Sequence, residues 1–176
     1  MRNLTAFSFL FFLMMACNNT PADQKKSENN NENKNAVPAN SKIKNGIVLK
    51  QNGLKAGQAF LLFDDGTRVP DDNTVQVNQQ VSLRLIVDGW SETNGKVFPG
   101  ASEKITTNEG GVLVSEADLF ESYSQSGVDK KDAEYLTLYA VVTKLDKLYD
   151  YFNVEFRVWD KKGNAELTGS YKLYIK

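Results

Sequence analysis

The sequence predicts an all-β domain, an immunoglobulin-like antiparallel β-sandwich with one short helix. Three observations support this prediction: apolar residues alternate with a period of two, turn-forming residues recur at short intervals, and only one segment begins like a helix. Two-residue alternation is typical of an antiparallel sheet with one solvated face. Short strands separated by frequent turns are typical of a sandwich or a barrel, and we favour the sandwich.

The clearest strands lie in the middle and at the end of the chain. In residues 81–87 the odd-numbered positions form one apolar face. Residues 151–159 alternate in the same way, with one face made of Phe152, Val154, Phe156 and Val158. Residues 160–164 then supply turn chemistry, because Gly163 suits a positive φ. The returning strand, residues 165–175, completes a C-terminal hairpin with an apolar face of Leu167, Tyr171, Leu173 and Ile175.

Five further strands are predicted from shorter apolar runs, at residues 43–50, 58–63, 74–77, 111–114 and 135–144. Turn signals separate them, including Asp-Asp-Gly and Asn-Gly sequences. The single helix is predicted to begin at Ser115, because Ser-Glu-Ala-Asp has the form of a capping box. Leu119, Phe120 and Tyr123 would share one face of this helix, and Gly127 would follow its end.

The start of the chain resembles the leader of a bacterial lipoprotein. Arg2 gives one positive charge, and the apolar run that follows is shorter than the ~20 residues that a spanning helix needs. The sequence Met-Met-Ala-Cys that ends at Cys17 resembles the lipobox, in which a small residue precedes the cysteine. The resemblance implies that a signal peptide, residues 1–16, is cleaved. It also implies that Cys17 is acylated on its sulfur and its new amino terminus, and so anchors the chain to a membrane.

Residues 17–42 comprise the acylated cysteine and a polar tether, and the domain follows at residues 43–176. Asn, Lys, Glu, Ser and Pro dominate the tether, which cannot bury enough apolar surface to offset the cost of ordering the chain. As a flexible coil it would span on the order of 25 to 30 Å. Its composition resembles that of Bacteroidota lipoprotein tethers. Because no acidic cluster follows Cys17, we favour the periplasmic face of the outer membrane over the cell surface.

Composition excludes several classes of function. The chain has no histidine and a single cysteine, Cys17, which lipidation would consume. Ser-His-Asp, Cys-His and histidine–metal mechanisms are therefore excluded, and no phosphate-binding glycine motif is present. The formal net charge of -1 becomes -2 once the leader and its one charged residue, Arg2, are removed, so the domain lacks the basic surface of a nucleic-acid binder. We expect neither an enzyme nor a cofactor.

Carboxylates are the remaining candidates for chemistry. Asp64 and Asp65 precede one short segment and Asp71 and Asp72 follow it, so their oxygens could converge on a Ca²⁺ ion. Paired carboxylates also serve glycosidases, at a separation that the sequence does not give. The alternative is that these residues form turns, which Asp favours. We favour the turn interpretation and predict no metal site, because the spacing is not that of an EF-hand.

Aromatic side chains are the candidate binding residues. Trp90 follows a predicted strand, and with Phe98 it would form a stacking platform for a sugar ring or an anchor for a protein partner. The alternative, which we favour for Trp90, is that its ring closes one end of the core. Further aromatic residues are expected on outer strand faces, where joint exposure would mark an interaction surface: Tyr135, Tyr139, Tyr151, Trp159 and Tyr174.

Two functional hypotheses follow from these observations. The first is a lipid-anchored outer-membrane protein that presents a non-catalytic interaction domain to an envelope protein partner. The second is a lipoprotein that binds a glycan or another small ligand through Trp90 and nearby loops. The exposure of the outer aromatic residues is the property that would separate the two hypotheses.

Overall fold

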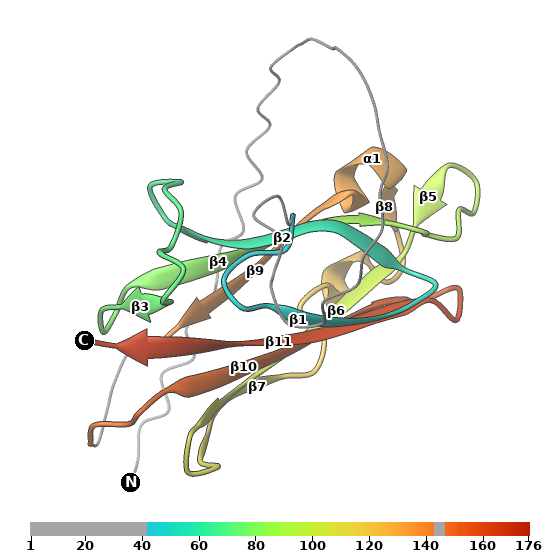
Figure 1. The fold of residues 1–176 in the computed structure, drawn as a ribbon. Coiled ribbons are helices and arrows are strands. Elements are labelled where there is room, and N and C mark those ends of the chain that lie inside the picture. The colour runs from blue at the N-terminus through green and yellow to red at the C-terminus, as the bar shows by residue number, and fades with distance from the viewer. Residues whose placement is uncertain (1–41, 143–146) are drawn as a thin grey trace, which may run out of the picture. The chain divides into compact units, whose positions relative to one another are not determined.

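The computed structural model describes residues 42–142 and 147–176 of the chain. Within these residues two antiparallel sheets stack on one hydrophobic core (Figure 1). The predicted all-β class and its antiparallel β-sandwich architecture are confirmed. The predicted signal peptide, Cys17 and most of the tether lie outside the described residues. In the part of the chain that is described, no helix is long and apolar enough to cross a membrane.

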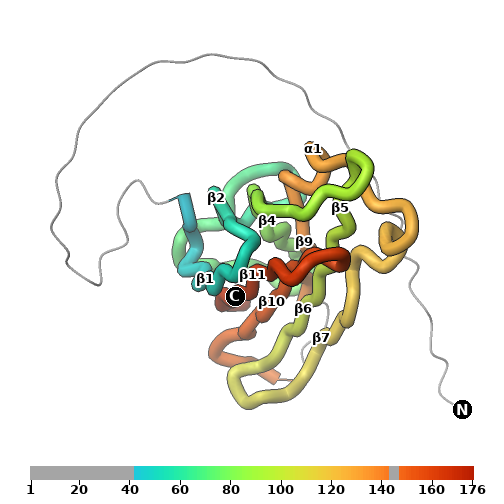
Figure 2. Tube along the Cα trace, turned by 90° about the vertical axis from the view of Figure 1, so that its right-hand side faces the viewer, coloured from blue at the N-terminus to red at the C-terminus, as the bar shows by residue number. Residues whose placement is uncertain are grey.

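The larger sheet is built around the predicted C-terminal hairpin. Its antiparallel strands lie side by side (Figure 2) in the order β1 (Val48–Asn52), β11 (Glu166–Ile175), β10 (Phe152–Asp160), β6 (Pro99–Thr107) and β7 (Val112–Glu116). A short strand, β3 (Thr74–Val75), pairs in parallel with the end of β11. This parallel pairing brings the loop before β3 to the C-terminal end of the chain.

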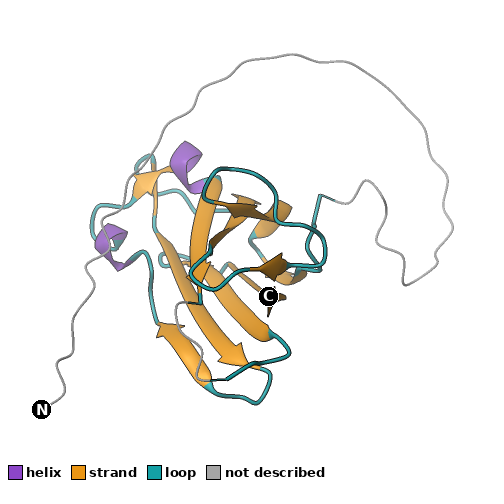
Figure 3. Ribbon diagram, turned by 90° about the vertical axis from the view of Figure 1, so that its left-hand side faces the viewer, coloured by secondary structure: helices purple, strands orange, loops and turns teal. Residues whose placement is uncertain are grey.

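The smaller sheet has three antiparallel strands, in the order β2 (Lys55–Phe63), β4 (Gln80–Asp88) and β9 (Tyr135–Val141). A separate two-stranded ribbon pairs β5 (Lys96–Val97) with β8 (Val128–Asp129). Two short helical segments, η1 (Glu121–Tyr123) and α1 (Lys130–Ala133), lie outside the two main sheets (Figure 3).

The predicted period-two alternation places the core between the sheets. Alternate side chains of β4, from Val81 to Val87, are at most 1% exposed. Those of β10, from Phe152 to Val158, are at most 3% exposed and face them from the larger sheet. Burial of such apolar surface contributes about 25 cal/mol per Å², so these side chains stabilise the packing of the two sheets against each other.

The prediction of a helix that begins at Ser115 is wrong. Ser115 lies in β7 and pairs with Lys104 of β6, because the edge of the larger sheet offers the backbone a ladder of hydrogen bonds. The chain turns at Asp118 instead, whose Oδ1 accepts hydrogen bonds from the backbone N–H groups of Phe120 (2.9 Å) and Ala101 (3.3 Å). Only the single turn η1 follows, and the capping box does not form.

Several other details differ from the sequence predictions, among them the unexpected short elements β5, β8 and α1. Strand β6 was not predicted, because Pro-Gly at its start looks like a turn and Glu103 interrupts its inner face. Strand β1 begins at Val48 rather than residue 43, since Asn45 and Gly46 form a turn with φ of 57° and 59°. Gly163 does not have a positive φ; its missing Cβ avoids a clash with Ser91 and Asp160.

Candidate functional site

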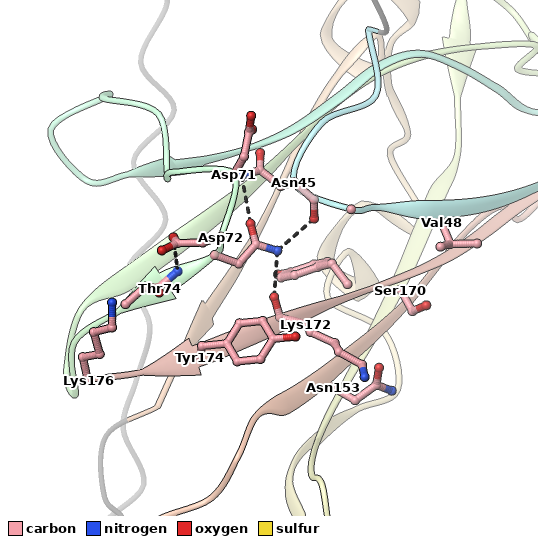
Figure 4. A pocket seen from close by; sticks show the side chains of 13 residues that line it. Asn45, Val48, Asp71, Asp72, Thr74, Asn153, Ser170, Lys172, Tyr174 and Lys176 are labelled. Atoms are coloured by element: carbon pink, nitrogen blue, oxygen red, sulfur yellow. Dashed lines mark hydrogen bonds between the residues drawn. The ribbon is translucent and has the colours of Figure 1, made fainter. Parts of the chain in front are cut away.

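An open pocket of about 700 Å³ lies on the outer face of the larger sheet, where the loop before β3 meets β11 (Figure 4). We call it the Tyr174 pocket. Loop residues such as Asp71 and Asp72 form one side, and outward-facing residues of β10 and β11, such as Asn153 and Lys172, form the floor. The pocket therefore rests on β10 and β11, the two strands of the C-terminal hairpin.

Two buried asparagines hold the wall of the pocket in place. The Asn45 Nδ2 donates to Asn73 Oδ1 at 2.9 Å, and the Asn73 Nδ2 donates to the carbonyl oxygens of Asn45 and Lys172, both at 2.8 Å. Asn45 also accepts a hydrogen bond from the backbone of Leu61 at 3.0 Å. Both asparagines have left-handed backbone conformations, with φ of 57° and 54°, which this residue type tolerates. The network ties two loops to β11.

The open side of the pocket carries aromatic and polar groups. Tyr174 is 39% exposed, and its ring centroid lies 6.2 Å from that of Tyr151. The Lys172 Nζ lies 3.7 Å from the centroid of the Tyr151 ring. Within residues 42–142 and 147–176, the side chains of Asn153 and Ser170 have no hydrogen-bond partner. Their amide and hydroxyl groups are thus available to a ligand that lies against Tyr174.

The charges around the Tyr174 pocket balance. Asp71 and Asp72 line it together with Lys172 and Lys176. Asp72 Oδ1 accepts a hydrogen bond from the backbone N–H of Thr74 at 3.0 Å, and this bond is the main cause of the lowered pKa of Asp72. The Thr74 hydroxyl and the charge of Lys176 lower this pKa further. Asp72 is therefore ionised at neutral pH. With two carboxylate and two ammonium side chains, the pocket favours a neutral polar ligand over an anion.

The predicted site at Trp90 is not an open surface. Trp90 is only 6% exposed, packs in the core and donates a hydrogen bond from Nε1 to the Ala133 carbonyl at 3.2 Å. Its ring therefore closes one end of the sandwich, as the favoured interpretation predicts. Phe98 is half-buried, and the Lys162 Nζ lies 5.1 Å from its ring centroid. Neither residue lines the Tyr174 pocket.

The four aspartates behave as turn residues. Asp65 Oδ1 accepts hydrogen bonds from the backbone N–H (2.8 Å) and hydroxyl (2.6 Å) of Thr67, which lower its pKa. Asp64 accepts from Gln80 Nε2 at 2.8 Å. Asp71 and Asp72 line the Tyr174 pocket, but Asp64 and Asp65 do not. Among the described residues, no group of three or more acidic side chains is placed to hold a metal ion.

The outer aromatic residues divide between the two sheets. Tyr174 lies on β11 and Tyr151 directly precedes β10, whereas Tyr135 and Tyr139, which are 57% and 42% exposed, lie on the outer face of β9. Trp159 is half-buried because its indole lies across Gly100, where a Cβ would overlap the ring. They therefore form two separate surfaces rather than one patch.

Sequence reasoning missed the polar part of the pocket. Asn153, Ser170 and Lys172 lie between the apolar residues of the predicted hairpin, and nothing in the sequence marks them as binding residues. Their alternation with buried residues is the signal that places them on one face, and the pairing of Asn153 with Lys172 across β10 and β11 brings them together. Asn45 gives no such signal, because its partners are distant in sequence.

Comparisons with known proteins find solved structures that resemble the chain. No protein-family model matches the chain, and no curated protein matches it. The chain is similar to the crystal structure of the C-terminal domain of wzt, with a TM-score of 0.45 and 15% sequence identity. The match covers 74% of this chain and 78% of that chain.

Proposed function

We propose that this protein is a membrane-anchored envelope lipoprotein that presents a non-catalytic β-sandwich interaction domain. The lipobox-like sequence at Cys17 supports the anchor, and the polar tether separates it from the sandwich. The proposed location is the outer membrane, with the domain facing the periplasm. The binding site of this domain is the Tyr174 pocket, and the single observation that supports this choice is its set of unpaired polar groups beside an exposed aromatic ring.

The chemistry of the pocket favours a glycan as the ligand over a protein partner. The face of the Tyr174 ring can stack against the C–H groups of a sugar, while Asn153, Ser170 and Asp71 offer donors and acceptors for its hydroxyls. The balanced charges fit a neutral polyhydroxylated molecule. The sequence placed glycan binding at Trp90, and the burial of Trp90 moves the proposal to this pocket. An envelope protein partner is the second candidate.

Replacing Tyr174 by Ala is expected to weaken glycan binding roughly tenfold. An aromatic contact of this kind contributes about 0.5 to 1.5 kcal/mol beyond its buried area, and 1.4 kcal/mol corresponds to a factor of ten. The measurement is binding of the full chain in detergent micelles to an array of neutral and anionic bacterial oligosaccharides. Isothermal titration then gives the affinity for each oligosaccharide that binds.

The matched control for this test is Tyr135→Ala, which removes an exposed tyrosine from the other sheet. It should leave glycan binding unchanged. If no oligosaccharide binds, or if both variants weaken binding equally, the glycan assignment is wrong. Crosslinking of the Tyr174 pocket to a defined envelope protein, with no glycan bound, would favour the protein partner instead.

Replacing Cys17 by Ala is expected to abolish membrane attachment. Without the thiol no diacylglyceryl group is added, so the chain stays unprocessed or becomes soluble. Fractionation of cells grown with labelled palmitate measures both properties. A Ser27→Ala variant, which changes a tether residue, should keep wild-type lipid labelling. The anchor assignment fails if the Cys17→Ala chain still takes up lipid and still sediments with membranes.

A further inference from the structure

The smaller sheet ends in an edge strand that carries no protection against further pairing. Strand β9 has the sequence Tyr-Leu-Thr-Leu-Tyr-Ala-Val, without a charged residue, proline or glycine. Edge strands of native proteins normally carry charges, prolines or bulges, because their free backbone groups pair readily with another extended chain. Among the described residues, β4 is the sole strand that pairs with β9.

The other edge strands of the sandwich are protected. Strand β7 carries Glu116 and has a shift in its register with β6. Strand β1 carries Lys50. Strand β2 has a register shift of its own, and Ile43 and Arg68 form bridges along its outer edge. Among the edge strands of the described residues, β9 is thus the one without protection against pairing with another strand.

Hydrogen bonds at the ends of β9 show which of its backbone groups are free. The Val87 N–H donates to the Glu134 carbonyl, and the Asn78 N–H donates to the Val142 carbonyl, both at 2.9 Å. Even-numbered residues of this segment therefore direct their backbone groups toward β4. Because this direction alternates along an antiparallel strand, the odd-numbered residues direct theirs to the free edge. They are Tyr135, Thr137, Tyr139 and Val141.

We propose that β9 pairs with β9 of a second copy of this chain, antiparallel and with the two-fold axis at Leu138. In this register Tyr135 lies opposite Val141 of the second copy, and Thr137 lies opposite Tyr139. All four residues with free backbone groups then exchange hydrogen bonds with the other strand. A shift of the register by two residues in either direction would leave some of these groups unpaired.

The side chains of β9 favour a second copy as the occupant of this edge. On the outer face, each tyrosine would lie opposite a β-branched residue, a favourable cross-strand pair. On the inner face, Leu138 would lie opposite Leu138 of the second copy, and Leu136 would lie opposite Ala140 of the second copy. The hydrophobic cores of the two copies would then be continuous. Since β9 carries no charge, pairing with itself places no like charges opposite each other. The pairing would also cover part of Tyr135 and Tyr139, which are 57% and 42% exposed.

This inference does not depend on the ligand of the Tyr174 pocket, which lies on the other sheet. It does gain from the proposed anchor, because two copies held on one membrane meet at a raised effective concentration. A dimer through β9 would present two Tyr174 pockets, so a repetitive ligand would bind to both at once. Loss of the dimer and loss of ligand binding are therefore separate experimental results.

The test uses the full chain purified in detergent micelles. We expect sedimentation analysis to show a dimer, and hydrogen exchange to be slow at the amides of Tyr135, Thr137, Tyr139 and Val141. The double variant Thr137→Lys and Tyr139→Lys places ammonium groups opposite each other, so it should be a monomer with fast exchange at Tyr135 and Val141. The matched control, Leu113→Lys with Ser115→Lys, makes the same change on the edge strand β7 and should stay dimeric.

A second measurement keeps the test decisive if the lysine variant fails to fold. The double variant Thr137→Cys and Tyr139→Cys should crosslink between copies on mild oxidation in membranes, because Cα atoms of such pairs lie about 5.5 Å apart. A wild-type monomer with fast exchange at these amides would overturn the proposal. Slow exchange in a monomer would show that the chain itself covers β9. A dimer that survives the lysine substitutions would place the interface elsewhere. Each of these two results would also overturn the proposal.

Discussion

The Glu103→Gln variant is expected to be more stable than the wild-type protein at pH 8, and about as stable at pH 4.5. Glu103 lies on the inner face of β6 and is 3% exposed, and its Oε1 has no hydrogen-bond partner among the described residues. Burial raises the pKa of Glu103 to about 8, and the neighbouring Glu116 contributes to the rise. Burying a carboxylate without a partner is unfavourable, so the folded protein retains the proton.

The direction of the pH dependence follows from this raised pKa. Between pH 4.5 and about 8 the folded chain holds a proton that the unfolded chain releases, so the free energy of unfolding falls as the pH rises. At about 1.4 kcal/mol for each pH unit, the loss is at most roughly 5 kcal/mol. The variant should not lose this stability, because glutamine does not ionise.

Urea denaturation at a series of pH values measures this effect. Glu116→Gln is the matched control, since Glu116 pairs with Glu103 across the sheet but is exposed. It should shift the profile only slightly, because burial is a larger cause of the raised pKa of Glu103 than Glu116 is. The aspartates with lowered pKa values, such as Asp65 and Asp72, change the free energy of unfolding only below pH 4, which is outside the range from pH 4.5 to 8. A wild-type stability that is constant between pH 5 and 8 would contradict the assignment.

Replacing Asn73 by Ala is expected to destabilise the domain by roughly 3 to 4 kcal/mol. The side chain of Asn73 makes three hydrogen bonds with Asn45 and Lys172, and each contributes about 1 kcal/mol. Alanine must also adopt the left-handed φ of 54°, which costs about 1 kcal/mol more. The wall of the Tyr174 pocket loses its link to β11, so glycan binding should weaken as well.

The variant Asn73→Gly separates the contribution of the side-chain hydrogen bonds from that of the backbone strain. Glycine accepts a positive φ without strain but lacks the amide, so it should destabilise the domain by about 1 kcal/mol less than alanine does. Urea denaturation of both variants gives the two values. If both lie within 1 kcal/mol of the wild-type stability, the asparagine network is not what holds the pocket wall in place.

Strands with regular alternation could be predicted from the sequence alone. In β4, β10 and β11 every second residue is apolar, and this local pattern determines which face is buried in any sheet that contains them. Strand β6 could not be found in this way, because Glu103 breaks its pattern and its first residues look like a turn. It is a strand because β10 and β7 pair with it on both sides.

The sequence by itself determined the all-β class and the C-terminal hairpin, and it is the basis of the proposed lipid anchor at Cys17, because each depends on neighbouring residues. Only the tertiary structure decided which polar residues meet. Asn73 reaches the Lys172 carbonyl across 99 positions of sequence, and the parallel pairing of β3 with β11 places the Asp71–Asp72 loop beside Tyr174. The sequence likewise shows that β9 is uncharged, but only the strand order shows that it is an edge. Contacts between distant segments depend on the packing of whole sheets, which no local pattern records.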